Sequence, residues 1–309
     1  MTLPMSAITI VKNRTQQLSS LITQLESSSA KPSELIVVWM SSPSDLSLIQ
    51  SSHFDVIHKF ANQDELPIAK ARNKGFSEAR YNSIVYFAVD AVISPTLIDE
   101  GYRTLDVNTL VSTSVKLLPI DLCDALASSK SINASKSQAL SKENDLKENY
   151  YGKPSYASTC CSAFFICKTD FENVGGFDEH FQGFGLNDED FITQCKCSGL
   201  VLKKISTVTF TPYRQQHRCP TNHLLNYVLN AKRFYRKWGS YPCKEVLSAF
   251  ASKGLINKDY EHSGLKVTRM PAHSHNEKTT PIADNLLPIN SVERISTANS
   301  AKHEAQAHV

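Results

Sequence analysis

The sequence lacks the segments that would direct the chain into or across a membrane. None of its apolar runs approaches the ~20 residues that a membrane-spanning helix requires. The N-terminus begins with a strand-like run at residues 7–11 instead of a basic segment followed by an apolar one. The sequence therefore predicts a cytoplasmic protein without a transmembrane segment.

The sequence also has little net charge and lacks cysteine pairs with the spacing of a zinc ribbon. The 33 Lys and Arg residues and 30 Asp and Glu residues leave a net charge of +3, too small to favour extensive neutralisation of nucleic-acid phosphates. The eight cysteines include no C-x-x-C pair of zinc-ribbon spacing, and reduced thiols are their simplest interpretation. We therefore expect no nucleic-acid partner.

The first 105 residues alternate apolar runs with amphipathic stretches. This pattern is typical of βαβ units on a mostly parallel sheet. The strands are expected at residues 7–11, 35–40, 56–60 and 83–89, and the helices at 15–25, 67–80 and 95–105.

The second half, residues 106–265, has fewer clear elements. Strands are expected at 110–118 and 201–210, an apolar block at 158–167, and a loop or loosely held helix at 121–149. Residues 221–238 read as a helix with Leu225, Val228, Leu229 and Phe234 available for a buried face. From about residue 266 the periodicity is lost, so residues 266–309 are expected to be a disordered tail.

Two polar positions have the residue types of a cation site. Asp90 directly follows the most apolar strand, and open α/β sheets bind ligands at the carboxyl ends of their strands. His217 follows the 201–210 strand region, and a neutral imidazole can complete a metal site. From position alone, a turn residue and a surface-loop histidine are equally simple interpretations.

Residues 175–191 combine four glycines with three consecutive carboxylates. Asp188, Glu189 and Asp190 repel one another, so the fold either exposes them or uses one of them. Exposed acids at a helix start are the simpler interpretation. The glycines favour a functional turn, because they allow a ligand to approach the backbone closely.

Five segments resemble the family 2 glycosyltransferases and occur in the same order along the chain. They are residues 11–14, 66–73, 89–90, 175–179 and 183–191. The second half also resembles the C-terminal region of the β-1,4-galactosyltransferases. The likeness extends over roughly residues 6–250 and is most specific at 175–191.

This resemblance implies a GT-A fold, an α/β architecture with a Rossmann-like, mostly parallel central sheet and flanking helices in one catalytic domain. Residues 1–105 would bind the nucleotide-sugar, with UDP-sugars favoured, and residues 106–265 the acceptor, a glycan or other hydroxyl. Asp188 matches the catalytic base, and Asp90 and His217 match the ligands of a Mn²⁺ or Mg²⁺ ion. The residues expected at the donor are Val11, Asn13, Arg14, Arg72, Asn73 and Asp90, and those expected at the acceptor are Phe184, Gly185, Asn187 and Glu189.

The sequence departs from the family pattern at several of these places. Ala88 stands where the first aspartate of the D-x-D motif is expected, and Asn187 replaces the glutamate before the catalytic aspartate. Phe184 replaces the tryptophan of the same motif. Trp39 and the three residues after it replace the acidic turn that often contacts the nucleotide base. Donor and acceptor identity therefore stay open.

The predicted activity is an inverting transfer of a hexose from a nucleotide diphosphate to a hydroxyl, as in carbohydrate biosynthesis. The alternative, suggested by Ala88 and Trp39, is a catalytically silent protein that binds a nucleotide-sugar or a glycan on the same fold. The segment that follows the first strand, from residues 11–14 onward, does not form a G-x-G-x-x-G motif, which argues against a Rossmann oxidoreductase. A nucleotidyltransferase would leave the glycine-flanked acidic block unexplained.

Basic and aromatic residues alternate at 232–238. The segment is a candidate for peripheral contact with the inner face of an anionic membrane or with an acidic acceptor. In the alternative interpretation its Lys and Arg side chains are solvated while Phe234 and Trp238 are buried.

Overall fold

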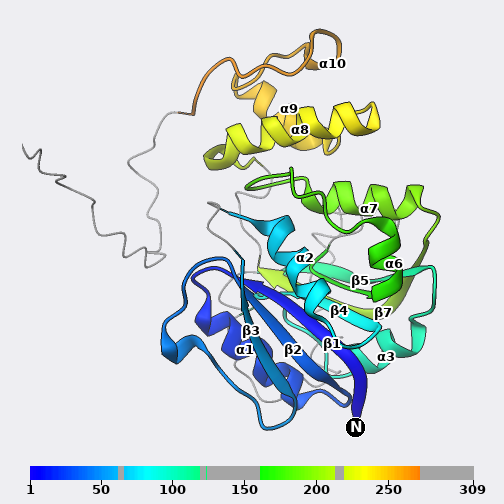
Figure 1. Ribbon diagram of the computed structural model, residues 1–309. Helices are drawn as coiled ribbons and strands as arrows, with labels where there is room; N and C mark the ends of the chain where they lie inside the picture. Colours follow the sequence, from blue (N-terminus) through cyan, green and yellow to red (C-terminus); the bar gives the residue numbers. More distant parts are fainter. Residues whose placement is uncertain (62–65, 119–122, 124–160, 213–218, 272–309) are drawn as a thin grey trace, which may run out of the picture. The chain divides into compact units, whose positions relative to one another are not determined.

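A sheet of seven strands, in the order β3-β2-β1-β4-β6-β5-β7, organises the part of the chain that is described (Figure 1). The computed structural model describes residues 1–61, 66–118, 123, 161–212 and 219–271. The strands are β1 (Thr2–Val11), β2 (Lys31–Trp39), β3 (Asp55–Phe60), β4 (Ser83–Ala88), β5 (Thr109–Leu118), β6 (Ala163–Cys167) and β7 (Val201–Pro212).

Helices connect and cover these strands. The longer ones are α1 (Thr15–Ser27), α2 (Ile68–Glu78), α3 (Leu97–Thr104), α6 (Lys168–Val174), α7 (Asn187–Cys197), α8 (Leu224–Trp238) and α9 (Lys244–Ser252). The short ones are η1 (Asp45–Ser47), η5 (Thr221–His223) and α10 (Tyr260–Ser263).

The sheet is mostly parallel, as predicted. β1 pairs in parallel with β2 and β4, β2 with β3, and β5 with β7. β6 is the exception, because it runs antiparallel to both β4 and β5. The region 201–210, expected to hold one or two strands, is one long strand, β7, that pairs with β5 from Thr109 to Leu118.

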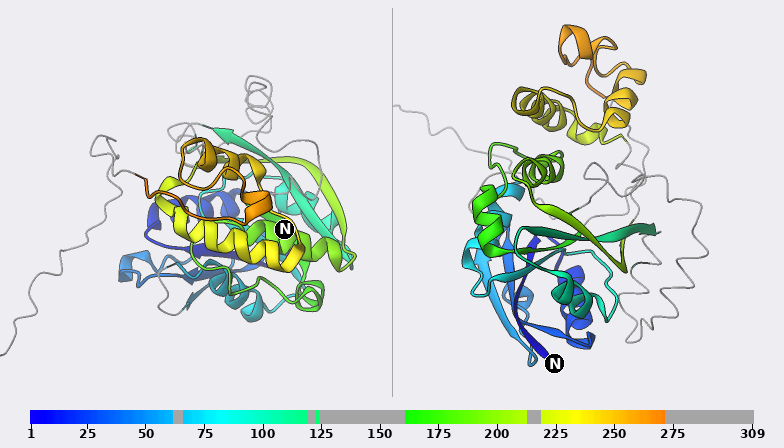
Figure 2. Two further views of the ribbon diagram at one scale, coloured as in Figure 1. Left: turned by 90° about the horizontal axis from the view of Figure 1, so that it is seen from above. Right: turned by 90° about the vertical axis from the view of Figure 1, so that its right-hand side faces the viewer.

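Both faces of the sheet are covered, which explains the continuous apolar runs in the sequence. Along β1, Ala7 and Val11 belong to the core under α1 and α3, whereas Ile8 and Ile10 belong to the core under α2, α6 and α7. Figure 2 shows these helices on the two sides of the sheet. Because successive side chains of a strand point to opposite faces, a strand covered on both faces is apolar at every position.

A third core lies among α8, α9 and α10 and includes Phe181 and Leu186 from the loop before α7. Val228 and Phe234 of α8 are buried there, as expected, but Leu225 and Leu229 are 49% and 63% exposed. The buried face of α8 therefore overlaps the predicted face only in part, because two of the four expected residues point away from the core. No helix among the described residues is long and apolar enough to cross a membrane.

The predicted tail begins later than residue 266 suggests. Val267 forms an antiparallel bridge with Ile256, and the backbone N–H of Lys266 donates to the side chain of Asn257. Residues 266–271 therefore pack with the third core. The rest of the expected tail, and the loop expected at 121–149 apart from Cys123, lie outside the described residues.

Candidate active site

The strand order places the switch point of the sheet between β1 and β4. The chain proceeds from β1 outward through β2 and β3, and then returns to β4 on the other side of β1. Val11 ends β1, and Asp90 comes two residues after the end of β4. In open α/β sheets, ligands bind in the crevice outside the carboxyl ends of the strands at this point.

An ion pair closes this edge of the sheet. Nη1 of Arg14, the residue before α1, donates to Oδ2 of Asp90. The side chains are 34% and 16% exposed, so the pair is partly accessible to a ligand. Nearby, Asn13 has a positive φ of 53°, and its Oδ1 accepts a hydrogen bond of 3.1 Å from Ser41 Oγ. Four of the residues expected at the donor, Val11, Asn13, Arg14 and Asp90, thus lie at the switch point.

A divalent cation would find one carboxylate here. The described residues contain no group of three or more His, Cys, Asp or Glu side chains placed to hold a metal ion. His217, the second expected ligand, lies outside the described residues. Mg²⁺ and similar ions are commonly held by one or two carboxylates together with substrate phosphates. Asp90 therefore fits an ion that takes most of its ligands from a bound diphosphate.

The turn after β2 is built differently from an acidic turn. Trp39 is 2% exposed, and its indole Nε1 donates to His58 Nδ1 at 3.0 Å. The second ring nitrogen of His58 lies 3.0 Å from the carbonyl oxygen of Ile49. Burial lowers the pKa of His58, and the Ile49 contact opposes this shift only in part. A neutral aromatic pair thus replaces a carboxylate at this position.

Asp188 lies in the first turn of α7 and pairs with an arginine of α2. Arg72 Nη1 is 2.5 Å from Asp188 Oδ1, and the Asp188 side chain is 33% exposed. Arg72 is itself buried, with its guanidinium carbon 4.8 Å from the ring centre of Tyr86 and 4.7 Å from that of Phe177. Burial opposes the charge on Arg72, but the charges of Asp188 and its other neighbours outweigh it and raise the pKa of Arg72.

Asn187 and Glu189 flank this carboxylate. Asn187 is 6% exposed, and among the described residues neither its amide nitrogen nor its oxygen has a hydrogen-bond partner. The thiol of Cys243 donates to Glu189 Oε1 over 3.1 Å. Burial and the neighbouring Asp188 charge raise the pKa of Glu189. The first turn of α7 therefore presents the partly exposed Asp188 carboxylate beside a buried amide that has no partner among the described residues.

The third carboxylate of the block, Asp190, is structural. Its side chain is 1% exposed, and it accepts bonds of 2.8 Å from Lys237 Nζ and from the indole Nε1 of Trp238. Arg233 pairs with Asp178 in the same region, at 3.2 Å. Three of the seven residues at 232–238, namely Arg233, Lys237 and Trp238, thus connect α8 to the acidic loop and to α7.

The glycine turn before α7 is held by one asparagine of α8. Asn230 Nδ2 donates to the carbonyls of Gln182 at 2.9 Å and Gly185 at 2.8 Å. Gly185 has a φ of +94°, and a Cβ there would lie 2.7 Å from the Tyr227 ring. Only glycine fits this turn without strain. The contacts predicted from sequence did not include Asn230, because its partners are backbone atoms.

Phe184, the residue expected at the acceptor, forms an aromatic pair with His223. The two rings are nearly parallel, with an interplanar angle of 17° and centroids 4.6 Å apart. Burial lowers the pKa of His223, which favours the neutral form of its ring. The pair offers a flat, partly exposed surface beside the glycine turn.

Asn73 forms hydrogen bonds with the loop after α6. Its Nδ2 donates to the Phe177 carbonyl at 2.8 Å and its Oδ1 accepts from the Phe177 N–H at 2.9 Å. Nδ2 also lies 2.9 Å from Glu179 Oε1. The side chains of Arg72 and Asn73, both expected to border the donor, are therefore directed toward the loop and helix that carry Asp188.

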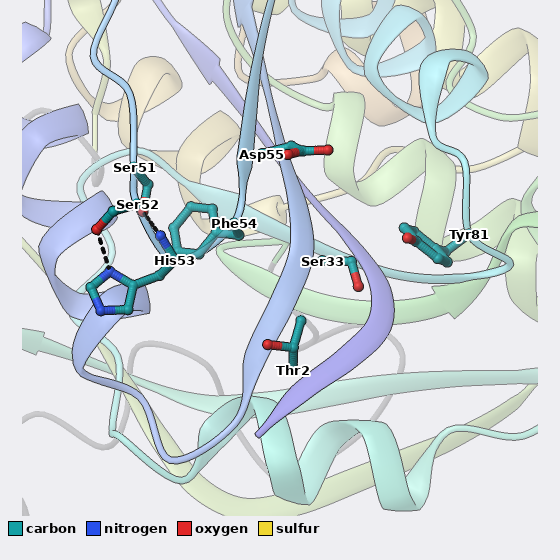
Figure 3. Close-up of a pocket in the computed structure, with 8 residues that line it drawn as sticks. All are labelled: Thr2, Ser33, Ser51, Ser52, His53, Phe54, Asp55 and Tyr81. Carbon is teal, nitrogen blue, oxygen red and sulfur yellow. Dashed lines mark hydrogen bonds between the residues drawn. The ribbon is translucent and has the colours of Figure 1, made fainter.

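A shallow polar recess lies at the opposite end of the strands (Figure 3). Thr2, Ser33 and Asp55, from the amino ends of β1, β2 and β3, line it together with Tyr81 and residues 51–54. Because ligands of open α/β sheets bind at the carboxyl ends, this recess is separate from the site described above.

Comparisons with known proteins agree with this arrangement. The family model described as "Glycosyltransferase like family 2" matches residues 9–238. No curated protein matches the chain. Among solved structures, S. aureus TarS 1–349 in complex with UDP-GlcNAc is 10% identical with a TM-score of 0.50, over 75% of this chain and 67% of that one.

Two further structures are similar at lower scores. The mannosyltransferase PcManGT from Pyrobaculum calidifontis, in complex with GDP-Man and Mn²⁺, is 16% identical with a TM-score of 0.47, over 82% of this chain and 70% of that one. The Drosophila β1,4-galactosyltransferase 7 catalytic domain, in complex with xylobiose, is 14% identical with a TM-score of 0.41, over 69% and 72%. The chain spans 66% of the TarS 1–349 structure and 40% of the longer TarS structure.

The matched region extends from the last residues of β1 to the end of α8 and contains every described candidate residue. The sheet order, the switch point and the family match all agree with the expected GT-A fold. The chain belongs to the glycosyltransferase-like family 2.

Proposed function

We propose that this chain is an inverting glycosyltransferase that moves a hexose, in the manner of galactosyltransferases, from a nucleoside diphosphate to an acceptor hydroxyl. UDP-sugars are the favoured donors. The observation that carries the proposal is Asp188, a partly exposed carboxylate in the first turn of α7, held by Arg72 and next to the buried amide of Asn187. Family membership supplies the reaction class.

In the proposed reaction Asp188 is the general base. It accepts the proton of the acceptor hydroxyl while that oxygen attacks the anomeric carbon from the face opposite the diphosphate. The bond between the anomeric carbon and the diphosphate oxygen breaks, and the diphosphate leaves with the electron pair. The configuration at the anomeric carbon is therefore inverted.

The donor is proposed to lie at the switch point, along Val11, Asn13, Arg14 and Asp90. The planar guanidinium donors of Arg14 suit a phosphate. Asp90, with His217 from outside the described residues, would hold a Mn²⁺ or Mg²⁺ ion. Such an ion, when bound, supplies positive charge that stabilises the leaving diphosphate. Asp90 would then exchange its contact with Arg14 for one with the ion.

The acceptor is proposed to lie at the start of α7, against Phe184, Gly185, Asn187 and Glu189. A sugar ring can pack its apolar face on the flat Phe184 and His223 pair. The Asn187 amide has both a donor and an acceptor to offer a hydroxyl, and a buried amide without a partner is costly unless a ligand satisfies it.

A screen of nucleotides and nucleotide-sugars by thermal shift, with and without Mn²⁺, tests this function. A ligand present at 100 times its dissociation constant adds about 2.7 kcal/mol of stability, a readily measured shift. Release of free sugar from the stabilising donor then shows turnover with water as acceptor. Stabilisation by no nucleotide would contradict the proposal.

The alternative is a catalytically silent protein that binds a nucleotide-sugar or a glycan. Ala88 in the place of a carboxylate, Asp90 neutralised by Arg14, and the Trp39–His58 pair favour it. Binding of a donor without any turnover, across a set of sugar acceptors and Mn²⁺ concentrations, would support this alternative over the enzyme.

We also propose peripheral membrane contact through one exposed stripe of α8. Arg233, Lys237 and Trp238 are engaged with Asp178 and Asp190. Leu225, Leu229, Lys232 and Arg236 follow one another at spacings of four and three residues, and all four are exposed. Exposed leucines beside cations are typical of a helix that lies on an anionic lipid surface.

A further inference from the structure

The guanidinium of Arg72 sits in a slot between two aromatic rings. The ring centres of Tyr86 and Phe177 lie 4.8 and 4.7 Å from its central carbon, and the residue is 7% exposed. A cation between two desolvated aromatic faces is attracted electrostatically by both of them. Arg72 is therefore fixed in direction, unlike a surface arginine that can swing toward an incoming ligand.

Three elements build this slot. Tyr86 lies on β4 and is 1% exposed. Phe177 is fastened through both its N–H and its carbonyl by Asn73, the residue that follows Arg72 on α2. The Phe177 ring also stacks on Phe191 of α7, with centroids 4.2 Å apart. The sheet, α2 and α7 thus hold the slot together.

From this slot Arg72 reaches the carboxylate of Asp188. Its Nη1 is 2.5 Å from Oδ1, while a third of the Asp188 side chain remains exposed. Charge-assisted contacts of this length are the stronger class of hydrogen bond and fix the orientation of a carboxylate. The partners are 116 positions apart in the sequence.

We propose that Arg72 is a positioning residue that holds Asp188 in the orientation of the base, and that it is not a ligand of the donor diphosphate. This inference rests on the proposed function, in which Asp188 accepts the proton. The Tyr86 and Phe177 rings and Asn73 are the parts that keep Arg72 directed at Asp188. The inference replaces the role at the donor that the sequence suggests for Arg72.

Two consequences separate positioning from donor binding. A misplaced base slows the chemical step by about 10²-fold while the donor binds as before, because the donor contacts are elsewhere. The positive charge of Arg72 also favours the ionised form of a neighbouring carboxylate. Without that charge, the acid limb of the pH–rate profile moves to higher pH.

The experiment compares Arg72→Lys and Arg72→Gln with the unaltered protein in donor hydrolysis from pH 5 to 9, and in titrations with UDP. Both variants are expected to lose kcat by about 10²-fold and to keep the donor KM and the UDP affinity. Arg72→Gln is expected to move the acid limb upward, and Arg72→Lys to leave it in place. Arg103→Gln, which removes an exposed arginine paired with Asp99 on α3, is the matched control with unchanged kinetics.

Two results would overturn the inference. A tenfold loss of UDP affinity with kcat retained would make Arg72 a donor ligand, and an unchanged kcat and pH profile would leave it without a role in the reaction. Thermal unfolding of each variant separates these results from misfolding. Asp188→Asn is measured in parallel. If the unaltered protein is inactive, the proposed function is contradicted. If the unaltered protein is active, Asp188→Asn is inactive and Arg72→Gln has normal kinetics, only this inference is contradicted.

Discussion

Arg14 and Asp90, 76 positions apart in the sequence, form an ion pair at the carboxyl ends of the neighbouring strands β1 and β4. The pair sits where the strand order of the sheet reverses, which is the position at which open α/β sheets bind ligands. Arg14 thus pairs with the carboxylate that a cation would need. Metal binding and release of Arg14 are expected to be coupled.

Asp90→Ala should remove the effect of Mn²⁺ on nucleotide binding. The substitution deletes the Asp90 carboxylate at the switch point, so UDP titrations with and without Mn²⁺ should give the same affinity, whereas the unaltered protein should bind about tenfold more tightly with the metal. Asp99→Ala, on the exposed face of α3, is the control. A Mn²⁺ dependence that survives Asp90→Ala would remove this residue from the metal site.

Asp188→Asn should abolish turnover and leave donor binding intact. Loss of a positioned base costs roughly 10²–10⁴-fold in rate, and the amide keeps the size of the side chain and a contact with Arg72. Donor hydrolysis and UDP titration measure the two quantities separately. Glu172→Gln, an exposed acid of α6, should change neither. Turnover at the normal rate in Asp188→Asn would refute its role as base.

Glu189→Gln should make the protein more stable at neutral pH. Burial and the Asp188 charge raise the pKa of Glu189 in the folded state above its ordinary value of 4.5. A carboxyl with a raised folded-state pKa stabilises the fold below its ordinary pKa, and this contribution is lost as the pH rises through the folded-state value. The variant escapes that loss and can still accept the bond from Cys243.

The measurement for Glu189→Gln is urea unfolding at pH 4 and at pH 8. The variant should gain over the unaltered protein at pH 8 and should not gain at pH 4. A difference of equal size at both pH values would show that ionisation of Glu189 is not its cause.

Asn230→Ala should destabilise the fold by about 1–3 kcal/mol, because it removes a buried side chain that donates to the carbonyls of Gln182 and Gly185. Urea unfolding measures this change. Leu229→Ala, one residue earlier on α8 and 63% exposed, should stay within about 0.5 kcal/mol of the unaltered protein. Equal effects of the two substitutions would mean that Asn230 does not hold the glycine turn.

Removing the exposed stripe of α8 should weaken any binding to anionic vesicles. Each cation near an anionic surface contributes about 1 kcal/mol, so Lys232→Gln with Arg236→Gln should lower the bound fraction on phosphatidylserine vesicles about tenfold or more. Sedimentation with these vesicles, and with neutral phosphatidylcholine vesicles, measures it. Lys258→Gln, an exposed lysine away from α8, is the control. If the unaltered protein binds neither vesicle, the membrane proposal is refuted.

The strands of the first half were predictable because their signals are local. The run that becomes β4 is apolar throughout, since both of its faces are covered, and Asp90 directly beyond it indicated the ligand-binding edge of the sheet. The glycines around Gly185 indicated a turn that no larger residue can form. The family match confirmed the fold that these segments suggested.

The faces of α8 were predicted less well. Leu225 and Leu229 satisfy a helical period as well as Tyr227 and Ala231 do, and only the second pair is buried. Asparagine and lysine side chains decide the rotation of this helix, because Asn230 bonds the glycine turn and Lys237 bonds Asp190. The spacing of apolar residues along a helix does not indicate such polar contacts.

The sequence by itself determined the alternation of strands and helices, the position of Asp90 at a strand end and the glycine turn beside the acidic block, because each depends on residues within one or two turns of one another. The tertiary structure alone decided which charges meet. Arg14 pairs with Asp90 because β1 and β4 are neighbours in the sheet, and Arg72 points to Asp188 because Tyr86 and Phe177 leave it one direction. Contacts across 76 and 116 positions depend on strand order and packing, which no local pattern encodes.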